Sequence, residues 1–298
     1  MSNYFWNILA RLAYPLFWER YKKQASALGL REPVFVLSFD CDTDADAEAT
    51  VDILEWLTAH DIKISLAVPG EQLLKHADLY RAAAEHADFI NHGARPHAEW
   101  HDGRYWSTTF YDQMSVSDVV NDIVQGHRIV CDTTGKIPRG FRAPHFAHVQ
   151  HPRLQRKIHH ALRKLKYAYS SSTLPREAFF KAPIYKIDEI YEIPVTGRYN
   201  APFNVFDSWS HVHSPEFPTI LQTYPRRLQD TVDALQEFNI PAILNYYVDP
   251  SHVIKQPLFY ETLLTIQEQG ILFYSFEDVL VRLHLIEQPH PQYEEATL

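Results

Sequence analysis

Several short apolar segments are followed by acidic or histidine side chains, which are residue types that bind metal ions and transfer protons. The segment "VLSFDCDTD" at 36–44 places Asp40, Asp42 and Asp44 at alternate positions after an apolar run. Side chains of a strand alternate between its two faces, so these carboxylates can share one face. Carboxylates this close repel one another unless a cation binds between them. The segment therefore predicts a cation site at the end of a buried strand.

Three other predicted strand ends also carry side chains that can bind metal or transfer protons. They are His92, His97 and His101 in "HGARPHAEWH", Arg142 and His145 in "RAPHF", and Asp249 and His252 in "DPSH". An aspartate with two histidines suits a divalent metal and leaves positions open for water and substrate. We therefore expect one bound divalent metal, with Zn²⁺ favoured and Co²⁺, Ni²⁺ or Mn²⁺ as alternatives.

The elements that must position these residues alternate between strands and helices from residue 34 onward. The predicted strands are 34–39, 64–69, 89–91, 140–144, 167–172, 191–195, 242–248 and 271–275. The predicted helices are 45–59, 71–86, 115–133, 152–166, 225–238 and 257–268. Strands that are apolar throughout are buried on both faces, which is typical of parallel sheets.

This alternation predicts an α/β fold, a distorted (β/α) barrel of seven to eight strands. Such barrels carry their active sites at the carboxyl ends of the strands, where the candidate residues fall. We expect the barrel to span 33–285, after a helical amphipathic extension over 1–32 and before a polar tail over 286–298.

The order of "SFDCD", "NHGARPH" and "GFRAPHF" along this chain resembles the polysaccharide deacetylases with a NodB homology domain, carbohydrate esterase family 4, over about residues 33–280. The resemblance implies a NodB-type barrel. It also implies that Asp40 is the general base, that Asp42 and His92 are metal ligands, and that Arg142 orients Asp40. Arg142 and Pro144 match the R-x-P element of that family.

The chain departs from the family pattern at two places. The second histidine of the family usually follows the first by four residues, where this chain has Pro96. We take His97 as the second ligand. His101 is the alternative, because it follows His97 by four residues, a spacing that fits one turn of a helix. In the family a Leu-x-His element supplies the histidine that is the general acid. This chain has "LNY" at 244–246, so Tyr246 stands at the position of that histidine. His252 is the nearest replacement for that acid.

Four further residues are candidates for substrate binding: Pro144, His145, Trp209 and Tyr105. Trp209 lies in "FDSW", which resembles the aspartate–tryptophan motif of the family, and an aromatic ring there or at Tyr105 can stack on a sugar. His211 and His213 are expected at the surface or in a substrate groove.

The net charge and the cysteine content indicate which partners and which cellular compartment to expect. A net charge of −9 argues against a dedicated nucleic-acid binder. Two cysteines do not form a disulfide framework, which favours a reducing compartment and a cytoplasmic location.

The aromatic segment 4–23 is too short to span a bilayer and is interrupted by Arg11 and Pro15. We expect it to be a helix packed on the barrel. The alternative is peripheral membrane contact, with Trp6, Phe17 and Trp18 at the lipid headgroups.

These observations predict a metal-dependent hydrolase that removes an N- or O-linked acyl group, most simply acetyl, from an amino sugar or glycan. One alternative is a metal-independent hydrolase of the same fold that acts on a cyclic amide. The other is a catalytically silent carbohydrate-binding protein, which the missing Leu-x-His and the displaced histidine favour.

Overall fold

The computed structural model describes residues 3–209 and 223–287, and the side chains of residues 3–12 are left out of the description. His211, His213 and all but the first two residues of the predicted polar tail lie outside the described residues.

The main sheet has eight strands in the order β10–β1–β2–β3–β6–β7–β9–β8. Neighbouring strands are parallel, except that β8 runs antiparallel to β9. The strands are β1 (Val34–Asp40), β2 (Ile64–Val68), β3 (Asp88–Asn91), β6 (Gly140–Phe141), β7 (Tyr169–Ser170), β8 (Tyr185–Ile187), β9 (Ile190–Glu192) and β10 (Ile243–Val248).

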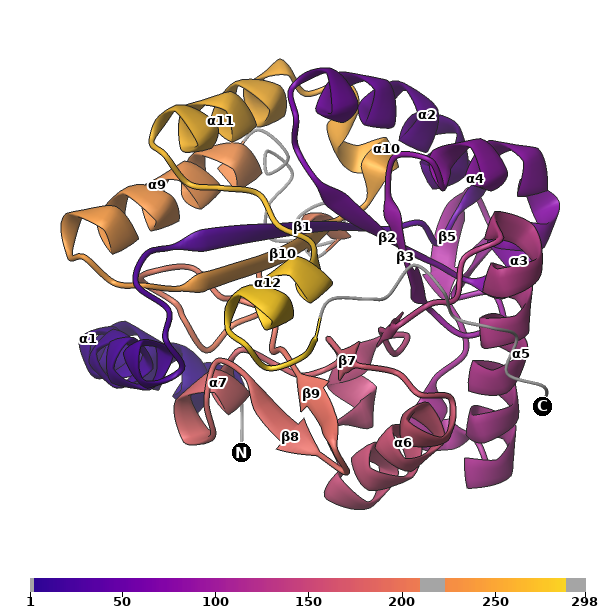
Figure 1. The fold of residues 1–298 in the computed structure, drawn as a ribbon, viewed down its shortest axis with the longest axis horizontal. Coiled ribbons are helices and arrows are strands. Elements are labelled where there is room, and N and C mark those ends of the chain that lie inside the picture. Colours follow the sequence, from indigo (N-terminus) through magenta and orange to yellow (C-terminus); the bar gives the residue numbers. More distant parts are fainter. Residues whose placement is uncertain (1–2, 210–222, 288–298) are drawn as a thin grey trace.

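The sheet curls into a half-barrel with helices around it (Figure 1), which confirms the predicted distorted (β/α) barrel. After β9 the chain crosses to β10, which is at the other end of the sheet. There the Thr196 N–H donates a hydrogen bond to the Asn245 carbonyl at 2.9 Å. The surrounding helices are α2 (Asp44–Ala59), α3 (Gly70–Lys75), α4 (Ala77–Ala83), α5 (Val116–Thr134), α6 (Pro152–Lys164), α7 (Arg176–Phe180), α9 (Thr223–Glu237), α10 (Pro250–Val253), α11 (Pro257–Glu268) and α12 (Phe276–Arg282).

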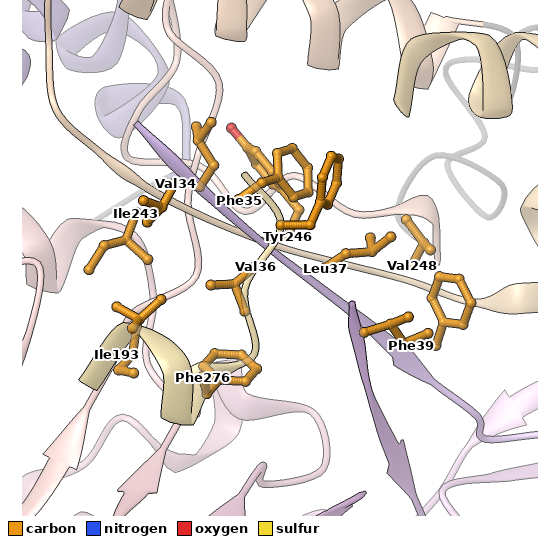
Figure 2. Close-up of a cluster of buried hydrophobic side chains, with 14 of the residues drawn as sticks. Val34, Phe35, Val36, Leu37, Phe39, Ile193, Ile243, Tyr246, Val248 and Phe276 are labelled. Atoms are coloured by element: carbon orange, nitrogen blue, oxygen red, sulfur yellow. The ribbon is translucent and has the colours of Figure 1, made fainter. Parts of the chain in front are cut away.

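Strand β1 runs through the centre of the core, and all seven of its residues are buried. Figure 2 shows Val36 beside Ile193 and Phe276 on one side of this strand, and Phe35 beside Tyr246 on the other. Because both faces are covered, a continuous apolar run forms this strand instead of an alternating one. The carboxyl end of β1 is therefore held rigidly, which matters because Asp40 is its last residue.

The N-terminal helix α1 (Asn3–Ala27) packs against the barrel, next to α7 (Figure 1). Phe17, Trp18 and Tyr21 are buried in the main core. The Trp18 Nε1–H donates to the Tyr199 carbonyl at 2.7 Å. Phe17 and Trp18 are thus covered by protein and are not available to lipid headgroups, while the Trp6 side chain lies outside the description. None of the helices the structure describes has the length and apolarity that a bilayer crossing needs.

Three predicted elements take another form in the structure, and β8, α7, α10 and α12 were not predicted. Residues 97–101 do not form a helical turn: β4 (Ala98–His101) and β5 (Arg104–Ser107) form an antiparallel hairpin. Its two-residue turn has positive φ at Asp102 and Gly103, which is the usual chemistry of a tight hairpin turn. The helix predicted at 71–86 is divided at His76 into α3 and α4. The strand predicted at 271–275 forms one bridge, between Phe273 and Phe35.

Candidate metal and catalytic site

The candidate residues lie at one rim of the barrel because each follows the carboxyl end of a parallel strand. Asp40 ends β1, and Asp42 is two residues further on. His92 directly follows β3, Arg142 directly follows β6, and Asp249 directly follows β10. Parallel strands end at the same edge, so residues distant in sequence meet there.

Asp42, His92 and His97 form the one group of potential metal ligands found in the described residues, and their ligand atoms lie within 4.8 Å of one another. The His92 Nδ1–H donates to the Arg142 carbonyl at 2.7 Å, which leaves Nε2 as its free nitrogen, 3.6 Å from Asp42 Oδ1. His97 Nδ1 is 3.1 Å from the same Asp42 oxygen. The protein thus orients one imidazole through a backbone carbonyl, as metal-binding sites commonly do.

The protonation of these groups fits a divalent cation. Burial lowers the pKa of His97 to about 4 and the pKa of His92 well below its usual range, so both rings are neutral at pH 7. Burial, followed by the nearby Asp249, raises the pKa of Asp42 to about 7. Among the described residues, His97 Nε2 is a buried nitrogen with no hydrogen-bond partner. A cation would remove the cost of burying these groups together, so the residues fit the metal that the sequence predicts.

His101 is not part of this group. It lies on β4 with its side chain 62% exposed, and its Nε2 is 3.2 Å from a Glu99 carboxylate oxygen. Asp44 also points elsewhere, because it accepts hydrogen bonds from Lys75 at 2.6 Å and from His76 at 3.1 Å. Asp40 and Asp42 therefore remain near His92, while Asp44 does not join them.

Asp40 is paired with a buried arginine. Arg142 has no exposed surface, and it donates to Asp40 Oδ1 at 2.6 Å and to Ser38 Oγ at 2.9 Å. Burial raises the pKa of Asp40 to about 7, while the charge of Arg142 acts in the opposite direction. The other oxygen, Oδ2, lies 3.9 Å from His92 Nε2. One oxygen of Asp40 thus holds the arginine and the other faces the metal ligands.

Two further buried carboxylates, Asp46 and Asp249, complete this rim, and of these only Asp249 is a candidate from the sequence. Asp46 caps α2: one of its oxygens accepts from the Thr43 hydroxyl at 2.6 Å, and the other accepts from the Ser251 hydroxyl at 2.6 Å. Asp249 accepts from the Ser208 hydroxyl at 2.7 Å. The spacing Thr43–Asp46 is a capping-box signature that could have identified Asp46 as fixed in place.

His252 lies beside Asp249, with its Nδ1 3.2 Å from Asp249 Oδ2 and 3.2 Å from Ser208 Oγ. Burial lowers the pKa of His252, but the hydrogen bond and charge of Asp249 outweigh burial and raise it. The ring of Trp209 lies 6.1 Å from the ring of His252. Tyr246 is at the family position of the acid, but it is buried and donates to the Gly197 carbonyl at 2.9 Å.

Of the other predicted substrate-binding residues, His145 lies beside a metal ligand. His145 has a left-handed backbone (φ 42°), its ring is 6.0 Å from that of His97, and its Nε2–H donates to the Thr108 carbonyl at 2.7 Å. Pro144 is buried between Arg142 and His145. Tyr105 lies on β5, where the Thr43 side chain and the charge of Asp44 are among the groups around its hydroxyl.

Residues 28–169, slightly less than half of the chain, match the family model of the polysaccharide deacetylases. The matched part contains Asp40, Asp42, His92, His97 and Arg142. His252 and Trp209 lie beyond it. No curated protein matches the chain.

Solved structures share the fold at low sequence identity. A polysaccharide deacetylase from Mycobacterium smegmatis is 12% identical, with TM-score 0.61, over 90% of this chain and 96% of that one. PuuE allantoinase is 15% identical, with TM-score 0.59, over 87% and 92%. A mutant of a Bacillus anthracis CE4 family pseudoenzyme, with restored enzymatic activity, is 12% identical, with TM-score 0.54, over 84% and 68%. At these identities the likeness establishes the fold only.

Proposed function

We propose that this protein is a metal-dependent deacetylase that hydrolyses the acetamide of an N-acetylated amino sugar within a glycan. The observation that carries the proposal is the cluster of Asp42, His92 and His97 beside the buried Asp40–Arg142 pair. A cation-binding set and a candidate general base on one rim of the barrel support the proposal, because such folds perform catalysis at that rim.

Asp42, His92 and His97 would hold the metal, with Zn²⁺ as the expected ion. A divalent metal bound there would polarise the scissile carbonyl and lower the pKa of water. The carbonyl of Arg142 fixes the tautomer of His92, so that its Nε2 lone pair stays available. Arg142 therefore supports the ligand set through its backbone and Asp40 through its side chain.

Asp40 acts as the general base and removes the proton of the attacking water. Its pKa of about 7 lets the carboxylate accept a proton near neutral pH, which is the range in which general bases work best. Arg142 keeps Asp40 oriented through a 2.6 Å hydrogen bond to one oxygen. The other oxygen is left for the water. Hydrogen bonding to a fixed cation is how a buried carboxylate retains its charge.

His252 acts as the general acid that protonates the leaving amine. Its raised pKa keeps the imidazole charged to a higher pH than a free histidine, and Asp249 orients it through Nδ1. Trp209 lies against the same histidine and would contact the sugar there. In this assignment His252 replaces the histidine that the family carries on the strand itself.

The test is acetate release from N-acetylated glucosamine oligosaccharides, with and without a chelator, by the full chain and by variants. Asp40→Asn keeps the shape of the side chain and removes its basicity, so turnover should fall about 10²–10⁴-fold while bound metal stays near the wild-type level. His97→Ala should lose bound metal. His101→Ala is the matched control and should keep both metal and activity, because its side chain lies outside the cluster.

A second candidate function is carbohydrate binding without catalysis, and the buried Tyr246 at the family position of the general acid favours it. The solved structures of similar fold include a pseudoenzyme. Retained metal together with no acetate release from any acetylated sugar would support this candidate. Acetate release that persists after complete metal removal would instead support a metal-independent amide hydrolase.

A further inference from the structure

We propose that Asp122, on α5, is a positioning residue for the metal site. Its buried carboxylate holds the loop 93–96 in the shape that lets His97 reach the same ion as His92. The inference rests on the proposed function, and it adds a residue from outside the ligand set. It also explains how this chain uses a spacing of five residues between the two histidines, where the family usually has four.

Asp122 connects α5 to the loop through its carboxylate, and its side chain has no exposed surface. Oδ1 accepts a hydrogen bond from the Arg95 N–H at 3.0 Å, and Oδ2 accepts one from the Tyr111 hydroxyl at 2.6 Å. The half-exposed Arg95 side chain also places its Nε 3.8 Å from Oδ1. Burying a carboxylate is costly unless it is hydrogen bonded, so these contacts favour one position of the loop relative to the helix.

The loop has no regular secondary structure, so its shape depends on hydrogen bonds to the elements around it. The Gly93 N–H donates to Asn91 Oδ1 at 3.0 Å, and the Gly93 carbonyl accepts from the Gly70 N–H at 2.8 Å. The Ala94 carbonyl accepts from the Glu71 N–H at 2.9 Å. These bonds tie the loop to β3 and to the start of α3, which both pack against α5 (Figure 1). Helix α5 completes this frame, because its carboxylate binds an N–H in the middle of the loop.

The loop and α5 are also in close backbone contact. Gly93 has φ of 82°, and a Cβ at this residue would overlap the Asp122 carboxylate and lie 2.8 Å from the Tyr111 hydroxyl. About one turn further along α5, a Cβ at Gly126 would lie 2.7 Å from the Gly93 carbonyl oxygen. The carboxylate therefore fills the space next to the residue that follows His92, and its removal would leave the loop room to shift.

The position of the loop decides whether the two histidines meet. Residues four apart on a helical turn lie on the same side without further support. His92 and His97 are five apart on a segment that is not helical, yet their ring centroids are 4.2 Å apart. His97 Nδ1 is also 3.1 Å from Asp42 Oδ1. Groups that orient metal ligands typically contribute about 10- to 100-fold to metal affinity, and Asp122 fits this role through the backbone of the loop.

The first experiment measures the zinc dissociation constant of chelator-stripped protein by competition with a chromophoric chelator. Asp122→Ala should weaken zinc binding about 10- to 100-fold, because the Arg95 N–H loses its acceptor. Asp122→Asn should stay within about threefold of the wild type, because Oδ1 remains and the Tyr111 hydroxyl can rotate to accept from the amide.

Val130→Ala is the matched control for lost stability, because Val130 is buried further along the same helix. It should leave the zinc affinity within about twofold of the wild type, since it removes no hydrogen bond to the loop. Wild-type affinity in Asp122→Ala, or an equal loss of affinity in Val130→Ala, would overturn the proposal.

A double variant keeps the test decisive if Asp122→Ala does not fold. Asp122→Leu with Tyr111→Phe replaces both hydrogen-bonding partners by apolar groups of similar shape, a change that folded proteins tolerate well. The Arg95 N–H still loses its acceptor, so zinc binding should weaken about tenfold or more. Wild-type zinc affinity in this variant would likewise count against the role of Asp122.

The second measurement is hydrogen exchange of the metal-free protein, which separates failure of this inference from failure of the proposed function. Peptides that cover 92–97 should exchange faster in Asp122→Ala than in the wild type, while peptides that cover 243–248 should not change. Unchanged exchange in the loop would overturn the role of Asp122 and leave the deacetylase proposal intact. With the expected loop exchange and zinc affinities, a wild-type chain that binds zinc but releases no acetate would refute the deacetylase and still support the role of Asp122.

Discussion

The buried pair of Arg142 and Asp40 permits a sharp prediction about both stability and catalysis. The perturbation is Arg142→Met, which keeps much of the side-chain length and removes the charge. Arg142 has no exposed surface, and its guanidinium contacts Asp40 at 2.6 Å and Ser38 at 2.9 Å. The substitution therefore leaves a buried carboxylate without its cation.

Breaking a buried ion pair by removing one partner typically costs about 3–5 kcal/mol. We expect a loss of this size at pH 8, where the free carboxylate of Asp40 is charged in the unfolded chain and uncompensated in the folded one. The double variant Asp40→Asn, Arg142→Met should lose less than the sum of the single variants, since neither buried charge remains.

The charge of Arg142 lowers the pKa of Asp40, so its removal should raise that pKa. Two pH effects follow. The stability loss should be smaller at pH 6 than at pH 8, because a carboxyl with a raised pKa is then protonated in the folded state. The acidic limb of the pH–rate profile should move to higher pH, because the base loses its active form at a higher pH than before.

The assays are urea unfolding at pH 6 and pH 8 and the pH dependence of kcat/KM for acetate release. Lys63→Met is a suitable control, since Lys63 pairs with Asp278 at the surface and away from Asp40. A profile for Arg142→Met with an unmoved acidic limb would refute the role given to this pair, even if the variant were unstable.

Three further outcomes are expected. Metal affinity should fall up to about tenfold per pH unit below pH 7, because a proton on Asp42, whose pKa is about 7, competes with the metal. An affinity that does not depend on pH between 5 and 7 would argue against Asp42 as a ligand. Trp18→Ala should destabilise the protein by about 3–5 kcal/mol in urea unfolding, because the indole is buried in the core; a change below about 1 kcal/mol would place α1 outside the cooperative unit. Burial acts to raise the pKa of Glu192, but hydrogen bonds from His159 and Ser172 outweigh burial and lower the pKa. The ionised Glu192 therefore stabilises the folded protein at neutral pH, and this stabilisation is lost as the pH falls through the folded-state pKa. Glu192→Gln should therefore lower the melting temperature more at pH 7 than at pH 3.5, and an equal decrease at both would contradict this.

The rim of the barrel was predictable because it depends on local patterns. Apolar runs indicate β1 and β3, and the residues that follow them, Asp40, Asp42 and His92, must lie at one edge once the strands are parallel. His97 follows His92 by five residues instead of the usual four, but the loop that carries His97 still brings its side chain to Asp42.

The features that the sequence did not indicate depend mostly on long-range partners. His159 lies on the basic helix α6 but is buried, and it bonds at 2.8 Å to Glu192 on a strand 33 residues away. The β4–β5 hairpin, in contrast, has a local signal. Asp102–Gly103 lies between aromatic residues and favours a tight turn, which outweighs the helical spacing of His97 and His101.

The central claim is that one divalent metal, held by Asp42, His92 and His97, is required for deacetylation. The most direct measurement is a zinc titration of chelator-stripped protein, with acetate release from an N-acetylglucosamine tetramer as the readout. Activity should be absent without metal and should rise to a plateau at one zinc ion per chain. Full acetate release by the metal-free protein, or a plateau that His97→Ala reaches at the same stoichiometry, would contradict the account.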